Sequence, residues 1–72
     1  MHIAALACSN GLGHTRRVVA IASFILKNGF SGKIDAYLPF AHLETLSKWE
    51  PYTFLRNHRN VHIIDFYYPQ KA

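Results

Sequence analysis

The sequence predicts an α/β fold with a parallel sheet, and three observations support this class. Short apolar runs at 2–8, 34–38 and 61–67 are typical of strands. Segments with apolar residues at helical spacing, 14–28 and 40–49, separate these runs. The order is therefore β-α-β-α-β. Right-handed crossovers then place the strands in one parallel sheet, in the order 3-2-1, with the helices on one side. We expect a Rossmann-like half-domain.

The first strand and helix have clear boundaries. His2–Cys8 is almost continuously apolar and rich in small alanines, which is typical of a strand covered on both faces. A polar turn occupies residues 9–13. The helix is expected from about His14 to Asn28, and Gly29 is well placed as a left-handed residue that stops it.

The second half of the chain is less regular. Ile34–Leu38 alternates, with Ile34, Ala36 and Leu38 on one face, and Pro39 ends the strand. A second helix is expected over Phe40–Trp49, and Glu50-Pro51 is expected to break it. Residues 52–60 fit either a loop or a short helical turn.

The length of the chain predicts an incomplete domain. Its 72 residues lie below the usual domain size. One face of the three-stranded sheet would be bare, and the first strand would lack a partner on its far side. We therefore expect residues 1–72 to form the first half of an amino-terminal Rossmann-like domain. The rest of an enzyme, or another chain, would cover the sheet.

The charge pattern restricts the partners. Eight basic and four acidic residues give a net charge of +4, which suits phosphate-bearing ligands and is compatible with an acidic membrane surface. The basic residues do not form a continuous face, which argues against nucleic acid. No apolar run approaches the ~20 residues of a membrane span, and the start does not resemble a signal peptide. A single cysteine fits a reducing compartment. We expect a cytoplasmic location, including the inner face of a membrane.

The turn after the first strand is the candidate binding site. It reads Ser9-Asn10-Gly11-Leu12-Gly13 and precedes a helix. In open α/β sheets, ligands bind at the carboxyl ends of strands. Glycines permit left-handed backbone and close approach of a ligand, and a helix amino terminus attracts anions. Ser9 and Asn10 offer hydrogen bonds to ligand oxygens, or serve only as cap and turn residues.

Two other ligand classes fit poorly. The dinucleotide fingerprint needs a third small residue where Arg16 stands, and an acidic residue where Leu38-Pro39 stands. A nicotinamide or flavin cofactor is therefore not expected. His58 and His62 are four residues apart, but they fall on a loop and a strand without a third metal ligand. No metal site is expected.

The turn and the residues after it resemble a known family. Gly11-Leu12-Gly13-His14-Thr15-Arg16-Arg17 forms a Gly-x-Gly-His-x-x-Arg motif. This motif resembles the amino-terminal loop of glycosyltransferases with the GT-B architecture. Among them, the chain is similar to the lipid II N-acetylglucosaminyltransferases and the related UDP-sugar hydrolases. The resemblance covers His2 to Gly29. It implies two Rossmann-like domains facing each other across a cleft, with most of the UDP-sugar bound by the carboxy-terminal domain.

The resemblance also implies roles for individual residues. His14 would act as the base that takes a proton from a hydroxyl acceptor, and Arg17 would pair with a phosphate. Gly11 and Gly13 would give the ligand access to the backbone. The enzyme would transfer a sugar from a nucleoside-diphosphate sugar without a bound metal, and this part alone would be inactive. The alternative is a non-catalytic phosphate-binding or protein-interaction module, with His14 capping the helix and Arg17 an ordinary surface charge.

Overall fold

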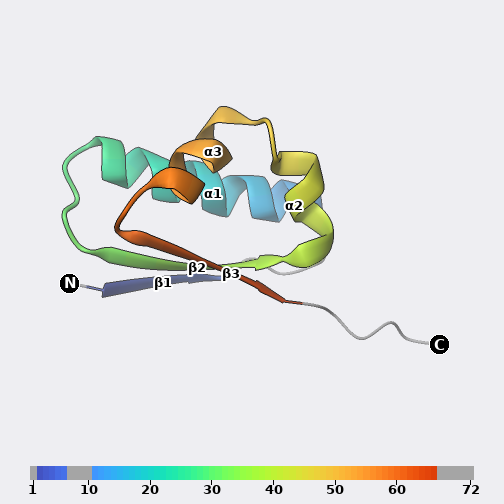
Figure 1. Ribbon diagram of the computed structural model, residues 1–72, viewed down its shortest axis with the longest axis horizontal. Coiled ribbons are helices and arrows are strands. Elements are labelled where there is room, and N and C mark those ends of the chain that lie inside the picture. The colour runs from blue at the N-terminus through green and yellow to red at the C-terminus, as the bar shows by residue number, and fades with distance from the viewer. Residues whose placement is uncertain (1, 7–10, 67–72) are drawn as a thin grey trace.

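The described part of the chain folds as an α/β unit with three strands and three helices (Figure 1). The computed structural model describes residues 2–6 and 11–66. Within these ranges the elements are β1 (His2–Leu6), α1 (Leu12–Lys27), β2 (Lys33–Pro39), α2 (Phe40–Leu46), α3 (Glu50–Asn57) and β3 (Val61–Phe66). The helices lie on one face of the sheet, so the predicted Rossmann-like arrangement is confirmed.

The sheet is parallel, with β2 in the centre. Its order is β1-β2-β3, which is the predicted order read from the other edge. Ala5 of β1 is in register with Ala36 of β2, which is in register with Ile63 of β3. The predicted face of β2 is also confirmed, because Ile34, Ala36 and Leu38 are completely buried while the residues between them are half-buried.

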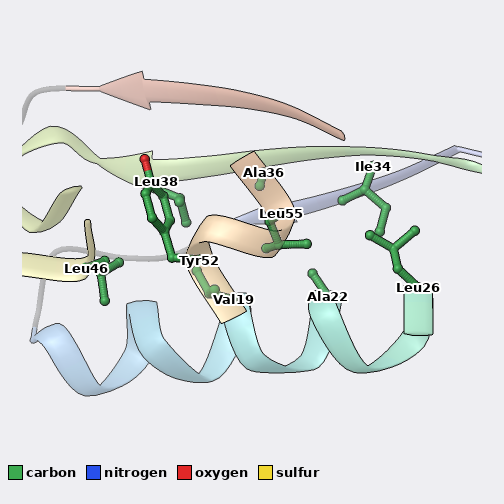
Figure 2. Packing of buried hydrophobic residues seen from close by; sticks show 9 residues of the cluster. All are labelled: Val19, Ala22, Leu26, Ile34, Ala36, Leu38, Leu46, Tyr52 and Leu55. Atoms are coloured by element: carbon green, nitrogen blue, oxygen red, sulfur yellow. The ribbon is translucent and has the colours of Figure 1, made fainter. Parts of the chain in front are cut away.

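The hydrophobic core lies between β2 and the helices (Figure 2). β2 contributes as many core residues as α1, because it has a neighbour on each side and helices over one face. Each helix adds at least one buried side chain. The core consists of Val19, Ala22, Leu26, Ile34, Ala36, Leu38, Leu46, Tyr52 and Leu55.

The end of α1 is set by Gly29. This residue has a φ of +102°, a left-handed value that side chains rarely adopt, as the sequence predicted. The chain then turns back, and the Phe30 backbone N–H donates to the carbonyl of Ile25 at 3.1 Å. The left-handed residue thus joins α1 to the segment leading into β2.

We expect Gly29→Ala to lower the free energy of unfolding by about 1–2 kcal/mol, because a Cβ in left-handed backbone meets the following carbonyl. A Cβ at Gly29 would meet no other atom of the described residues within 4 Å, so the cost is conformational. Urea denaturation measures it. Gly13→Ala is the control, because Gly13 lies in α1 where alanine is favoured. Equal stability of the two variants would contradict the prediction.

The second helical region differs from the prediction. α2 ends at Leu46 rather than Trp49, and Glu50 and Pro51 begin α3 instead of breaking a helix. The predicted helix does end before Pro51, but the break lies at 47–49 rather than at Glu50-Pro51. Proline is accepted in the first turn of a helix, where its missing N–H would have had no partner. The ambiguous residues 52–60 are helical as far as Asn57.

The face of the sheet opposite the helices has no covering element in the described part of the chain (Figure 1). On β1, His2, Ala4 and Leu6 are exposed. His2 Nε2 lies 2.7 Å from a carboxylate oxygen of Asp35, which links β1 to β2. The predicted bare face is thus confirmed for these residues.

Among the described residues, no helix is long and apolar enough to cross a bilayer.

Candidate functional site

The candidate site lies where α1 and α2 begin, at the carboxyl end of the sheet (Figure 1). Gly11 is the residue before α1, and α2 follows β2 without a loop. α1 and α2 also contact each other. Ser9 and Asn10, both predicted to bind ligand oxygens, fall outside the described residues.

The glycines of the turn are extended or helical rather than left-handed. Gly11 is extended, with a φ of 172°, and Gly13 lies inside α1 because the helix begins at Leu12 rather than His14. Neither uses the left-handed backbone that glycine permits. A Cβ at either position would meet no atom of the described residues within 4 Å. Packing against those residues therefore does not require glycine there.

His14 and Arg17 lie close together on an exposed side of α1. They are three residues apart, so the helix places them as neighbours on its surface. The His14 backbone N–H donates to the carbonyl of Gly11 at 3.2 Å, which closes the first turn. Neither side chain forms a hydrogen bond or ion pair with another described residue. Within that part of the chain, the His14 side chain does not cap α1, and both groups remain accessible to a ligand.

A pair that sequence reasoning missed stands beside them. Thr15 is completely buried, and its hydroxyl oxygen lies 2.6 Å from Nδ1 of the half-buried His42. Which atom donates depends on the tautomer of His42. This hydrogen bond ties the first turn of α1 to α2. The sequence contained a signal for this pairing, because His42 comes three residues after Pro39, the last residue of β2. The carboxyl ends of parallel neighbouring strands meet at one edge of a sheet.

The charge around the start of α1 is positive. The helix has no acidic residue in its first turn, and its amino terminus carries the positive end of the helix dipole. Arg17 is exposed, while the Arg16 guanidinium lies 5.8 Å from the centre of the Trp49 ring. That cation–π contact holds α1 against the junction of α2 and α3. The arrangement favours an anion near Gly13 and His14.

The two histidines considered for metal binding, His58 and His62, lie in different environments. His58 Nδ1 accepts a hydrogen bond from the Asn60 backbone N–H at 3.1 Å, and its ring lies 5.5 Å from that of Phe54. His62 is exposed on β3. Among the described residues, no three histidine, cysteine, aspartate or glutamate side chains are grouped to hold a metal ion.

Comparisons with protein-family models, curated proteins and solved structures find no match for this chain. The function therefore has to be argued from the site itself.

Proposed function

We propose that the chain is the amino-terminal part of a glycosyltransferase that moves a sugar from a nucleoside-diphosphate sugar to a hydroxyl acceptor. One observation carries the proposal. An exposed histidine, His14, lies in the first turn of a helix that follows a parallel strand, beside glycines with open space next to them. A base and an anion-attracting backbone are thus combined at the edge of the sheet where α/β folds bind ligands.

In the proposed reaction, His14 acts as general base. A neutral imidazole accepts the proton of the acceptor hydroxyl as its oxygen attacks the anomeric carbon of the sugar. The bond from that carbon to the diphosphate breaks, and its electron pair leaves with the nucleoside diphosphate. The amino terminus of α1 and the Arg17 guanidinium stabilise the negative charge on that diphosphate.

The remaining residues of the turn give the ligand access. Gly11 and Gly13 leave room for an oxygen to approach the backbone N–H groups of α1. Ser9 and Asn10 are proposed to contribute hydrogen bonds to the same ligand. The family resemblance assigns most donor binding to a second domain, so we propose that these 72 residues alone bind weakly and do not catalyse.

The test is made on the longest natural form of the protein that contains this chain. We expect it to bind UDP and to turn over a UDP-sugar. His14→Ala should bind UDP within about twofold of the wild type and lose about 10²–10⁴-fold in turnover, the usual contribution of a general base. Calorimetry measures the binding, and release of UDP measures the turnover. His62→Ala, at an exposed histidine on β3, is the matched control and should retain both.

Two outcomes would contradict the proposal. If neither protein binds a nucleotide or turns over a nucleotide sugar, the glycosyltransferase assignment is wrong. If both bind equally and the wild type has no turnover, the site is a non-catalytic phosphate-binding module. Loss of turnover in the His62→Ala control would show that His14→Ala acts through the fold rather than through the base.

A further inference from the structure

His42 has one ring nitrogen engaged and the other accessible. Its Nδ1 lies 2.6 Å from the hydroxyl oxygen of Thr15, the residue that follows His14. Its Nε2 forms no hydrogen bond or ion pair with any described residue. His42 is half-buried, and no buried side-chain nitrogen in the described part of the chain lacks a partner, so Nε2 is open to solvent. A polar atom is thus held beside the first turn of α1.

The position of His42 is fixed by the packing of α2. Pro39 is the last residue of β2 and directly precedes α2, so no loop separates His42 from the sheet. Leu46 lies one turn further along α2, on the side that His42 shares, and it is completely buried in the core. α2 also contacts α1 (Figure 1). The ring is therefore directed toward α1 by the core as well as by Thr15.

The burial of Thr15 decides which ring nitrogen carries the proton. Thr15 is completely buried, and among the described residues its hydroxyl has no partner other than His42. A hydroxyl has one proton to donate, and a buried donor without an acceptor lowers stability. The acceptor that these residues offer is Nδ1, so the Thr15 hydroxyl donates to Nδ1. A neutral imidazole then carries its own proton on Nε2.

We propose that His42 is a ligand-binding residue of the candidate site, and that its Nε2–H donates a hydrogen bond to a phosphate oxygen of a nucleoside diphosphate. The identity of this ligand rests on the proposed function. The donor role does not, because any oxyanion accepts the same hydrogen bond. A nitrogen that already carries a proton cannot take one from a hydroxyl, so His42 is a donor to the ligand while His14 remains the base.

The charges near His42 favour an anionic oxygen as the acceptor. α1 has no acidic residue in its first turn, and Arg17 is exposed two residues after Thr15. Glu44 is the acidic residue of α2, but it lies two positions after His42 and therefore on another side of the helix. A hydrogen bond to an ionised acceptor is about twice as strong as one between neutral groups. His42 therefore adds most to binding when the acceptor is a phosphate.

Two substitutions of His42 separate ligand binding from a merely structural role. The side-chain amide of asparagine is attached to Cγ, as Nδ1 is, so His42→Asn places a polar group near Nδ1. The amide of glutamine is one bond further out, so His42→Gln places a donor near Nε2. His42→Asn thus retains a partner for Thr15 and loses the donor to the ligand, whereas His42→Gln does the reverse.

Calorimetry on the longest natural form of the protein tests the proposal with inorganic diphosphate and UDP as ligands. We expect His42→Asn to bind both about 10- to 100-fold more weakly, the usual effect of losing a hydrogen bond to a charged group. His42→Gln should lose less affinity than His42→Asn, although it unfolds at a lower urea concentration because Thr15 loses its partner. A purely structural role for His42 predicts the opposite order of affinities. A loss of affinity for UDP alone would place His42 against the nucleoside and overturn the phosphate contact.

His58 provides the matched control. It is also half-buried, and its Nδ1 also accepts a hydrogen bond, from the Asn60 backbone N–H at 3.1 Å. It lies between α3 and β3, at the end of the parallel sheet opposite to the candidate site. His58→Asn should therefore leave the affinities for diphosphate and UDP unchanged. An equal loss in His58→Asn and His42→Asn would overturn the proposal.

Nuclear magnetic resonance of the wild type, with isotope-labelled histidine, keeps the test decisive if a variant does not fold. The ring nitrogens of His42 should show the Nε2–H tautomer. Added diphosphate should shift the Nε2 resonance of His42 and leave the ring resonances of His58 unchanged. A proton on Nδ1 of His42, or a His42 ring that does not respond to bound diphosphate, overturns the proposal.

The outcomes also separate this proposal from the proposed function. If the wild type turns over a UDP-sugar but His42→Asn binds UDP as tightly as the wild type, the glycosyltransferase assignment stands and the role of His42 is wrong. If diphosphate binding depends on His42 as expected but no nucleotide sugar is turned over, the role of His42 stands in a non-catalytic phosphate site. If neither diphosphate nor UDP binds, both proposals are wrong.

Discussion

Replacing Leu55 with alanine is expected to remove about half of the free energy of unfolding of the chain. Leu55 of α3 is completely buried in the core shared with α1 and β2. Removing such a side chain costs about 2–5 kcal/mol, from lost burial and from the cavity left behind. At 0.05–0.15 kcal/mol per residue, the whole chain has only about 4–10 kcal/mol. Urea denaturation followed by circular dichroism measures the loss.

The comparison variant is Leu43→Ala on α2. Leu43 is half-buried at the margin of the same core, so the same deletion should cost roughly half as much, because less apolar area returns to water. The measurement is made at low protein concentration, so that self-association does not add to the stability. If Leu55→Ala costs no more than Leu43→Ala, then α3 does not close the core as described.

The features that local pattern could predict are those that depend on neighbouring residues. The alternation of Ile34, Ala36 and Leu38 identified the buried face of β2, because successive side chains of a strand point to opposite faces. Gly29 could be identified because a glycine directly after a helical stripe is the usual left-handed stop. The parallel order followed from the handedness of the crossovers.

The sequence pattern could not predict features that depend on contacts distant in sequence, nor the exact residue at which a helix begins. Pro51 breaks or begins a helix depending on whether the segment after it packs, and Tyr52 and Leu55 do pack into the core. The start of α1 lies two residues earlier than predicted, which places Gly13 inside the helix. The pairing of Thr15 with His42 spans 27 residues and no local rule contains it.

The surface of α1 changes along its length. Its first turn has exposed polar groups, open space beside glycine and no acidic residue, which suits an anion. Its middle has exposed apolar side chains and no charge, which suits another helix.

Thr15→Val is expected to lower the free energy of unfolding by about 1–3 kcal/mol, because it leaves the ring nitrogen of His42 without its partner in a partly buried place. Valine has nearly the shape of threonine and a similar helix propensity, so neither a cavity nor propensity accounts for a loss. Urea denaturation gives the magnitude. A double-mutant cycle with His42→Ala should return a coupling of about 0.5–3 kcal/mol, as for residues in direct contact.

Thr53→Val provides the matched control. The Thr53 hydroxyl donates to the carbonyl of Glu50 at 3.0 Å within the first turn of α3, where water can replace it, so we expect a loss below about 0.5 kcal/mol. If Thr15→Val costs no more than Thr53→Val, the hydrogen bond to His42 does not hold α1 and α2 together. The first turn of α1, and with it His14, would then be positioned mainly by the contact of Arg16 with Trp49. Arg16→Gln should in that case become the variant that displaces the site.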